Sequence, residues 1–124
     1  MTIIEAIDRL DSLKPNIYTQ NDKIRWLSKL DWMVKKQIID THEGADDASF
    51  AGYTDDTDIN AELLVPAPHD EVYLRWLEAQ IDYHNGEYYK YSNAIIMFNT
   101  EFEAYAAYYN QNHRPVNRGK RFLF

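Results

Sequence analysis

Apolar residues three or four positions apart recur through most of this chain, and this spacing constrains its fold more than any other feature. The longest such stretch covers residues 87–112. Its apolar positions are Tyr91, Ala94, Ile95, Phe98, Phe102, Tyr105, Ala106 and Tyr109. The spacing predicts one helix about 39 Å long, since an α-helix rises about 1.5 Å per residue. A single domain rarely needs so long a helix internally, so part of it is expected to project.

Three shorter helices are predicted before this one, over residues 2–13, 19–40 and 70–84. The first has a capping-box pattern, with Thr2 before the apolar run and Glu5 three residues later. Pro15 ends it, because proline lacks an amide hydrogen and restricts the residue before it. Gly86 separates the third helix from the fourth. We therefore expect an all-α fold, a small bundle of about four helices.

The length and composition predict one soluble domain over residues 1–124. A chain of 124 residues with 45% hydrophobic residues can bury one core. No stretch reaches the roughly 20 apolar residues that cross a bilayer, and the first residues lack the apolar run of a signal peptide. The absence of cysteine excludes disulfides and thiolate chemistry and fits a reducing compartment, so cytosol is the default expectation and no membrane partner is expected.

The net charge of −7 is concentrated in one segment. Residues 41–62 hold seven acids and no Lys or Arg, and residues 41–66 are predicted to be a long acidic loop between the second and third helices. Its expected surface acids are Asp46, Asp47, Asp55, Asp56 and Asp58. Leu63-Leu64-Val65 is expected to anchor the end of the loop on the core. The overall acidity argues against specific nucleic-acid binding.

No pattern in the chain predicts catalysis, a metal or a cofactor. Asp56, Asp58, Asn60 and Glu62 have the alternate spacing of a calcium loop, but Ala61 stands where that loop requires glycine. A solvated acidic loop is the favoured interpretation. The four histidines are scattered at element ends and form no zinc-binding motif, and no phosphate loop or nucleophile elbow is present. We expect that the protein is not an enzyme.

The tyrosines are concentrated in one segment, since seven of the ten lie between residues 82 and 110. Tyr91, Tyr105 and Tyr109 fall on the apolar stripe and are expected in the core. Tyr88, Tyr89 and Tyr108 fall off that stripe, so we expect them to face outward as candidate subunit contacts.

The tail over residues 114–124 is basic and aromatic, and it holds the remaining interface candidates. These are Arg118, Lys120, Arg121, Phe122, Leu123 and Phe124. Such a tail either frays in solution or docks on a neighbour. Exposure of the terminal Phe-Leu-Phe would be costly, so docking is favoured, and the acidic loop of an adjacent copy is one possible partner surface.

Six stretches of the chain resemble a known family. They are Ile24-Arg25-Trp26-Leu27-Ser28-Lys29-Leu30-Asp31 with Ile38-Ile39-Asp40-Thr41-His42, Leu64-Val65-Pro66-Ala67-Pro68 with residues 73–83, residues 93–99, and residues 108–115. Together they resemble head-tail connector, or adaptor, proteins of Gram-positive phages and prophages. The resemblance rests on apolar and aromatic patterning. It implies a helical-bundle subunit of a ring, commonly twelvefold, beneath the portal, and it carries no catalytic residues.

The resemblance therefore implies a structural subunit of the virion neck, assembled in the bacterial host cytoplasm. Its partners would be copies of itself, the portal and other neck or tail proteins, with DNA only as passing cargo. The alternative is a small cytosolic interaction or regulatory protein with an acidic binding surface. Outward tyrosines and the Phe-Leu-Phe tail favour self-assembly, whereas the acidic loop suits both functions.

Overall fold

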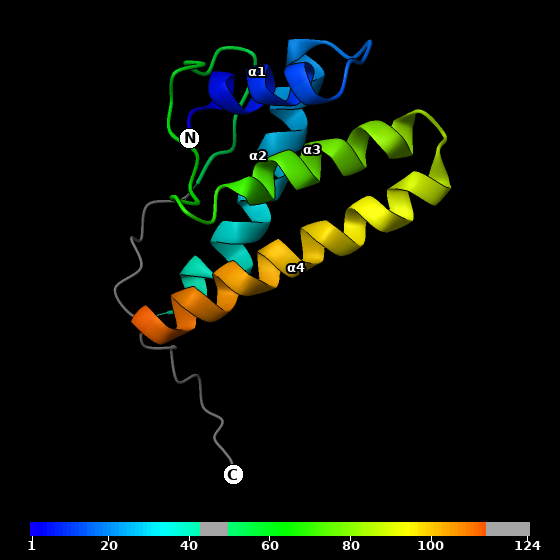
Figure 1. Ribbon diagram of the computed structural model, residues 1–124. Helices are drawn as coiled ribbons and strands as arrows, with labels where there is room; N and C mark the ends of the chain where they lie inside the picture. Colours follow the sequence, from blue (N-terminus) through cyan, green and yellow to red (C-terminus); the bar gives the residue numbers. More distant parts are fainter. Residues whose placement is uncertain (43–49, 114–124) are drawn as a thin grey trace.

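The computed structural model describes residues 1–42 and 50–113, which form four α-helices and one short 3₁₀-helix (Figure 1). The helices are α1 (Ile3–Leu13), α2 (Gln20–Gln37), the 3₁₀-helix η1 (Ile39–Thr41), α3 (Glu71–His84) and α4 (Tyr88–Asn112). Within these ranges there is no β-strand, and Thr2 and Glu62 form an isolated antiparallel bridge. The predicted all-α fold is confirmed.

Local capping signals determine where α1 and α2 begin. Thr2 and Thr19 each accept a hydrogen bond from the backbone of the acid three residues later, and Glu5 and Asp22 accept one in return. These backbone hydrogen bonds lower the pKa of both carboxyls. The start of α3 differs from these two caps. Asp70 holds the N-cap position but makes no capping hydrogen bond, and its carboxylate lies 3.7 Å from the Met1 amino nitrogen.

Helix α3 is the centre of the bundle, because it packs against α1, α2 and α4. Helices α3 and α4 form an antiparallel pair, α2 crosses behind them, and α1 lies at the far side of α3 from α4 (Figure 1). The side chain of Trp76 joins three of these elements. Its indole N–H donates to the Trp26 carbonyl of α2 at 2.7 Å, and its ring lies 5.0 Å from that of Phe98 in α4.

The connection from α2 to α3 is held on the bundle over residues 50–70. Leu63 and Val65 are buried, which confirms that the end of the loop is anchored on the core. The carbonyls of Ile59 and Ala61 accept hydrogen bonds from the first amides of α1 at 2.9 and 3.1 Å. These amides have no partner within the helix, so the loop satisfies backbone groups that α1 leaves open.

Helix α4 is the outermost helix and the least buried one. It has 25 residues against 14 in α3, yet only Phe98 and Tyr105 are buried. The expectation that part of it projects needs correction, because its C-terminal half is also packed. The rings of Tyr105 and His69 lie 5.6 Å apart, and those of Tyr109 and His42 lie 4.7 Å apart.

Candidate functional site

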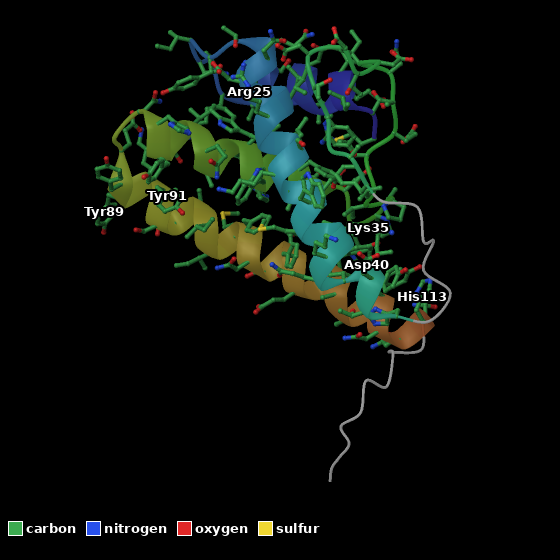
Figure 2. All side chains as sticks on the ribbon, turned by 180° about the vertical axis from the view of Figure 1, so that it is seen from behind. Arg25, Lys35, Asp40, Tyr89, Tyr91 and His113 are labelled. Atoms are coloured by element: carbon green, nitrogen blue, oxygen red, sulfur yellow. The ribbon has the colours of Figure 1, made fainter. Side chains whose placement is uncertain are left out.

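The outer side of α4 exposes several large apolar side chains, and we call this surface the α4 face. Its residues are Tyr88 (63% exposed), Tyr89 (87%), Ile96 (62%), Met97 (46%) and Tyr108 (43%). Figure 2 shows Tyr89 at the edge of the molecule, where α4 begins. The other exposed large apolar residues belong to other elements: Leu13 and Ile17 lie at the end of α1 and just after it, Trp32 on α2 and Tyr83 on α3. A concentration of apolar surface on one element marks a candidate contact site.

The α4 face is also poor in charge and contains small residues. Only Lys90, Glu101 and Glu103 are charged in this helix, and Ala104 and Ala107 are exposed. Small side chains let another surface approach the helix backbone closely. Low charge reduces the desolvation cost when water leaves a contact. The α4 face is therefore suited chemically to a protein partner.

The predicted interface residues fall into two groups. Tyr88, Tyr89 and Tyr108 are exposed, although Tyr108 also lies 4.8 Å from the His69 ring. Their contact with another subunit stays a prediction. The tail residues lie outside the described part of the chain: Arg118, Lys120, Arg121, Phe122, Leu123 and Phe124. Of the tyrosines expected in the core, Tyr105 is buried and Tyr91 and Tyr109 are half-buried.

Sequence reasoning missed Ile96 and Met97, the two central residues of the α4 face. The signal was present, because residues 94–98 are apolar without interruption. A helix turns through 100° per residue, so such a run cannot lie on one side. With Ile95 and Phe98 directed toward the bundle, Ile96 and Met97 must point away from it.

A second surface follows α2, and we call it the α2 stripe. Arg25, Lys29, Trp32 and Lys36 are all exposed and recur at intervals of four, three and four residues, which places them on one side of the helix. The Lys36 amine lies 5.4 Å from the Trp32 ring centre, a cation–π contact. Figure 2 shows Arg25 on this side of α2.

The other two basic residues of α2 differ from those of the stripe. Lys23 and Lys35 are buried. Their amines lie 2.7 Å from an Asp11 oxygen and 3.0 Å from an Asp40 oxygen. Long aliphatic stems let both lysines cross apolar surface while the charged end finds a partner. Only the α2 stripe presents exposed positive charge along this helix.

The acidic loop contributes a compact turn over residues 54–60, which we call the acidic turn. The Thr57 amide donates to the Thr54 carbonyl at 3.0 Å, and the Asn60 amide donates to the Asp58 carboxylate at 2.9 Å. Three predicted surface acids are exposed on this turn: Asp55, Asp56 and Asp58. The other two, Asp46 and Asp47, lie outside the described residues. In residues 1–42 and 50–113, no group of three His, Asp or Glu side chains could hold a metal.

A buried carboxylate fixes this loop to the helices. Asp31 of α2 is fully buried and accepts hydrogen bonds from the Tyr53 hydroxyl, from the Tyr73 hydroxyl at 2.7 Å and from the Leu64 amide at 3.1 Å. Burial raises the pKa of Asp31 and the pKa of both tyrosines. The Tyr73 hydroxyl also accepts from the Val65 amide at 2.7 Å. Asp31 thus organises the segment that carries the acidic turn.

An aromatic groove lies where α2, α3 and α4 meet. It has a volume of about 380 Å³ and is lined by Lys29, Trp76, Gln80, Tyr83, His84 and Tyr91. The His84 ring stacks on Trp26 with centres 5.2 Å apart, so this part of the wall is held by the fold. The groove is open to solvent and adjoins the α2 stripe through Lys29.

At the opposite end of α4, His42 joins η1 to the last helix. Its Nε2 lies 2.5 Å from the Asn110 side-chain oxygen, and its Nδ1 lies 2.5 Å from the Ile38 carbonyl. The imidazole is buried. Its contacts are structural, because they tie the C-terminal end of α4 to the end of α2.

Comparison of the chain with family models, with curated proteins and with solved structures finds no match. No helix in the described ranges combines the length and the apolarity that a membrane crossing requires.

Proposed function

We propose that this chain is a structural assembly protein, a head-tail connector subunit that forms a ring beneath the portal of a phage particle. The α4 face carries the proposal. Helix α4 has 25 residues but buries only two side chains in the core of the bundle. It presents five large apolar residues outward. The choice of a phage neck as the assembly rests on the sequence resemblance to head-tail connector proteins.

The shape of the fold supports this proposal. The α4 face lies on an outer helix that is fixed at both ends, by the turn to α3 and by the contact between His42 and Asn110. A rigid helix presented in this way loses little conformational entropy when it binds. Its apolar residues and exposed alanines suit close packing against a neighbouring subunit or the portal.

The mass of the purified protein, measured by light scattering alone and then with portal rings from the same genome, tests the proposal. We expect a ring-sized species or co-migration with the portal. The double substitution Ile96→Glu/Met97→Glu should abolish either association, since it would bury two charges without partners. Leu13→Glu is the matched control, because Leu13 is 65% exposed on α1, and it should assemble normally.

A protein that stays monomeric and does not co-migrate with the portal would refute the connector function. That result would favour the alternative, a regulatory protein whose acidic turn blocks a basic site on its target. The exposed Asp55, Asp56 and Asp58 are the observation that favours this second function. Their replacement by Asn should then weaken binding to that target, with steeper loss at low salt than at high salt.

A further inference from the structure

The α2 stripe is a basic surface on a protein of net charge −7. Its three charges extend over about 16 Å of helix, since Arg25 and Lys36 are 11 residues apart. Trp32 lies between them; its ring contacts Phe50 of the acidic loop, with ring centres 5.7 Å apart, and 39% of the residue stays exposed. An exposed tryptophan surrounded by cations is a common composition of a binding hot spot.

The charges of the stripe are only partly matched within the molecule. Arg25 pairs with Asp22 at 3.2 Å, on an exposed part of α2. Across residues 1–42 and 50–113, neither Lys29 nor Lys36 lies in an ion pair, and the same holds for Asp55, Asp56 and Asp58 of the acidic turn. Within these residues, each copy therefore offers two positive charges outside ion pairs on the α2 stripe and three negative charges outside ion pairs on the acidic turn.

The acidic turn is preorganised for such a contact. Hydrogen bonds within residues 54–60 fix its backbone. Further along the chain, the Leu64 amide donates to the Asp31 carboxylate and holds that residue on α2. The preceding residues are fixed on α2, because the Tyr53 amide donates to the Ser28 hydroxyl at 2.9 Å. The acids thus keep a defined position relative to α1 and α2, which lowers the entropy lost in binding.

We propose that the α2 stripe of one copy binds the acidic turn of a second copy. This inference rests on the proposed function and names a second contact between subunits, in addition to the α4 face. Lys29 and Lys36 would face the carboxylates of Asp55, Asp56 and Asp58, and Trp32 would be covered at the centre. Because the contact joins two different patches, it is heterologous and can repeat from subunit to subunit, as a ring requires.

Charge reversal on each side tests the pairing. The variants Lys29→Glu/Lys36→Glu and Asp55→Lys/Asp56→Lys each place like charges in the contact, so each should self-associate about tenfold more weakly than the unmodified protein in light scattering at low salt. An equimolar mixture should associate again, because the reversed stripe of one variant meets the reversed turn of the other. Net charge cannot produce this rescue, since the changes move it from −7 to −11 and −3, so both variants stay negative.

Two controls make the outcome specific. Arg9→Glu reverses one exposed base of α1 and should leave association unchanged, whereas Lys29→Glu alone should weaken it. Circular dichroism should show native helix content for every variant, because all the changed side chains are exposed.

The possible results separate this inference from the proposed function. If the unmodified protein assembles and the variants assemble equally well, or the mixture is not rescued, the inference is overturned and the connector function stands. A monomer with and without portal overturns both. If Lys29→Glu/Lys36→Glu loses retention of a double-stranded DNA oligonucleotide while self-association is unchanged, the stripe binds nucleic acid and the inference is wrong.

Discussion

Replacement of Asp31 by alanine should destabilise the protein by about 3 kcal/mol. The substitution removes the acceptor of the Tyr53 hydroxyl, the Tyr73 hydroxyl and the Leu64 amide. A hydrogen bond to a charged group contributes about 1.5–3 kcal/mol, so three bonds contribute about 6 kcal/mol together. Relief of the desolvation of the buried carboxylate returns several kcal/mol, which leaves the smaller net loss.

Urea unfolding, followed by the fluorescence of Trp26, Trp32 and Trp76, measures this loss. Asp31→Asn should cost about 2 kcal/mol, because its amide keeps the volume but turns a donor toward one of the hydroxyls. Asp8→Ala is the control, since Asp8 is exposed on α1, and it should lie within about 0.5 kcal/mol of the unmodified protein.

The loss should also be localised. Hydrogen exchange of the Leu64 amide should accelerate in Asp31→Ala more than exchange of the α3 amides, because the loop loses its attachment before the helices separate. A destabilisation below about 1 kcal/mol, or unchanged exchange at Leu64, would refute the reasoning that Asp31 holds the loop.

Three further predictions concern backbone and titration. Gly52→Ala should cost about 2 kcal/mol in urea unfolding and Gly86→Ala about 1 kcal/mol, because both glycines have positive φ. Only a Cβ added at Gly52 would also meet a neighbouring atom, the Ser28 hydroxyl oxygen at 2.7 Å. Equal costs would contradict this account. Thr19→Ala should lower stability by about 1 kcal/mol and Thr19→Asn by much less, and a neutral alanine would show that the cap is dispensable. Folded Asp31 binds its proton more tightly than unfolded Asp31, so its contribution to stability is full below its ordinary pKa of 3.8 and falls as pH rises through its higher folded pKa. The cost of Asp31→Ala should therefore shrink from pH 4 to pH 7, and a cost that grows would have the wrong sign.

Local signals made the helices predictable. Thr2 with Glu5 and Thr19 with Asp22 are patterns within four residues, and each cap in the structure forms between these two nearby residues. Pro15 and Gly86 act locally too. The start of α3 was predicted at the right position, but Asp70 lies near the distant Met1 amine and makes no capping hydrogen bond to its own helix.

The loop attachment could not be predicted in the same way. Asp31 finds Tyr53 and Tyr73 at separations of 22 and 42 residues, and no local pattern encodes such a pairing. One signal was available, since Asp31 follows Leu30 on the apolar side of a helix, and a buried acid requires hydrogen-bond donors. Their identity depends on the path of a loop that the sequence leaves open.

The exposure of α4 separates the residues that maintain its packing on the core from the residues that are available for binding. Most substitutions that change the outer residues of α4 leave the core intact, since only Phe98 and Tyr105 of this helix are buried. Surface substitutions away from special features usually change stability by less than about 0.5 kcal/mol. Substitutions on the α4 face can therefore change what it binds without loss of folding.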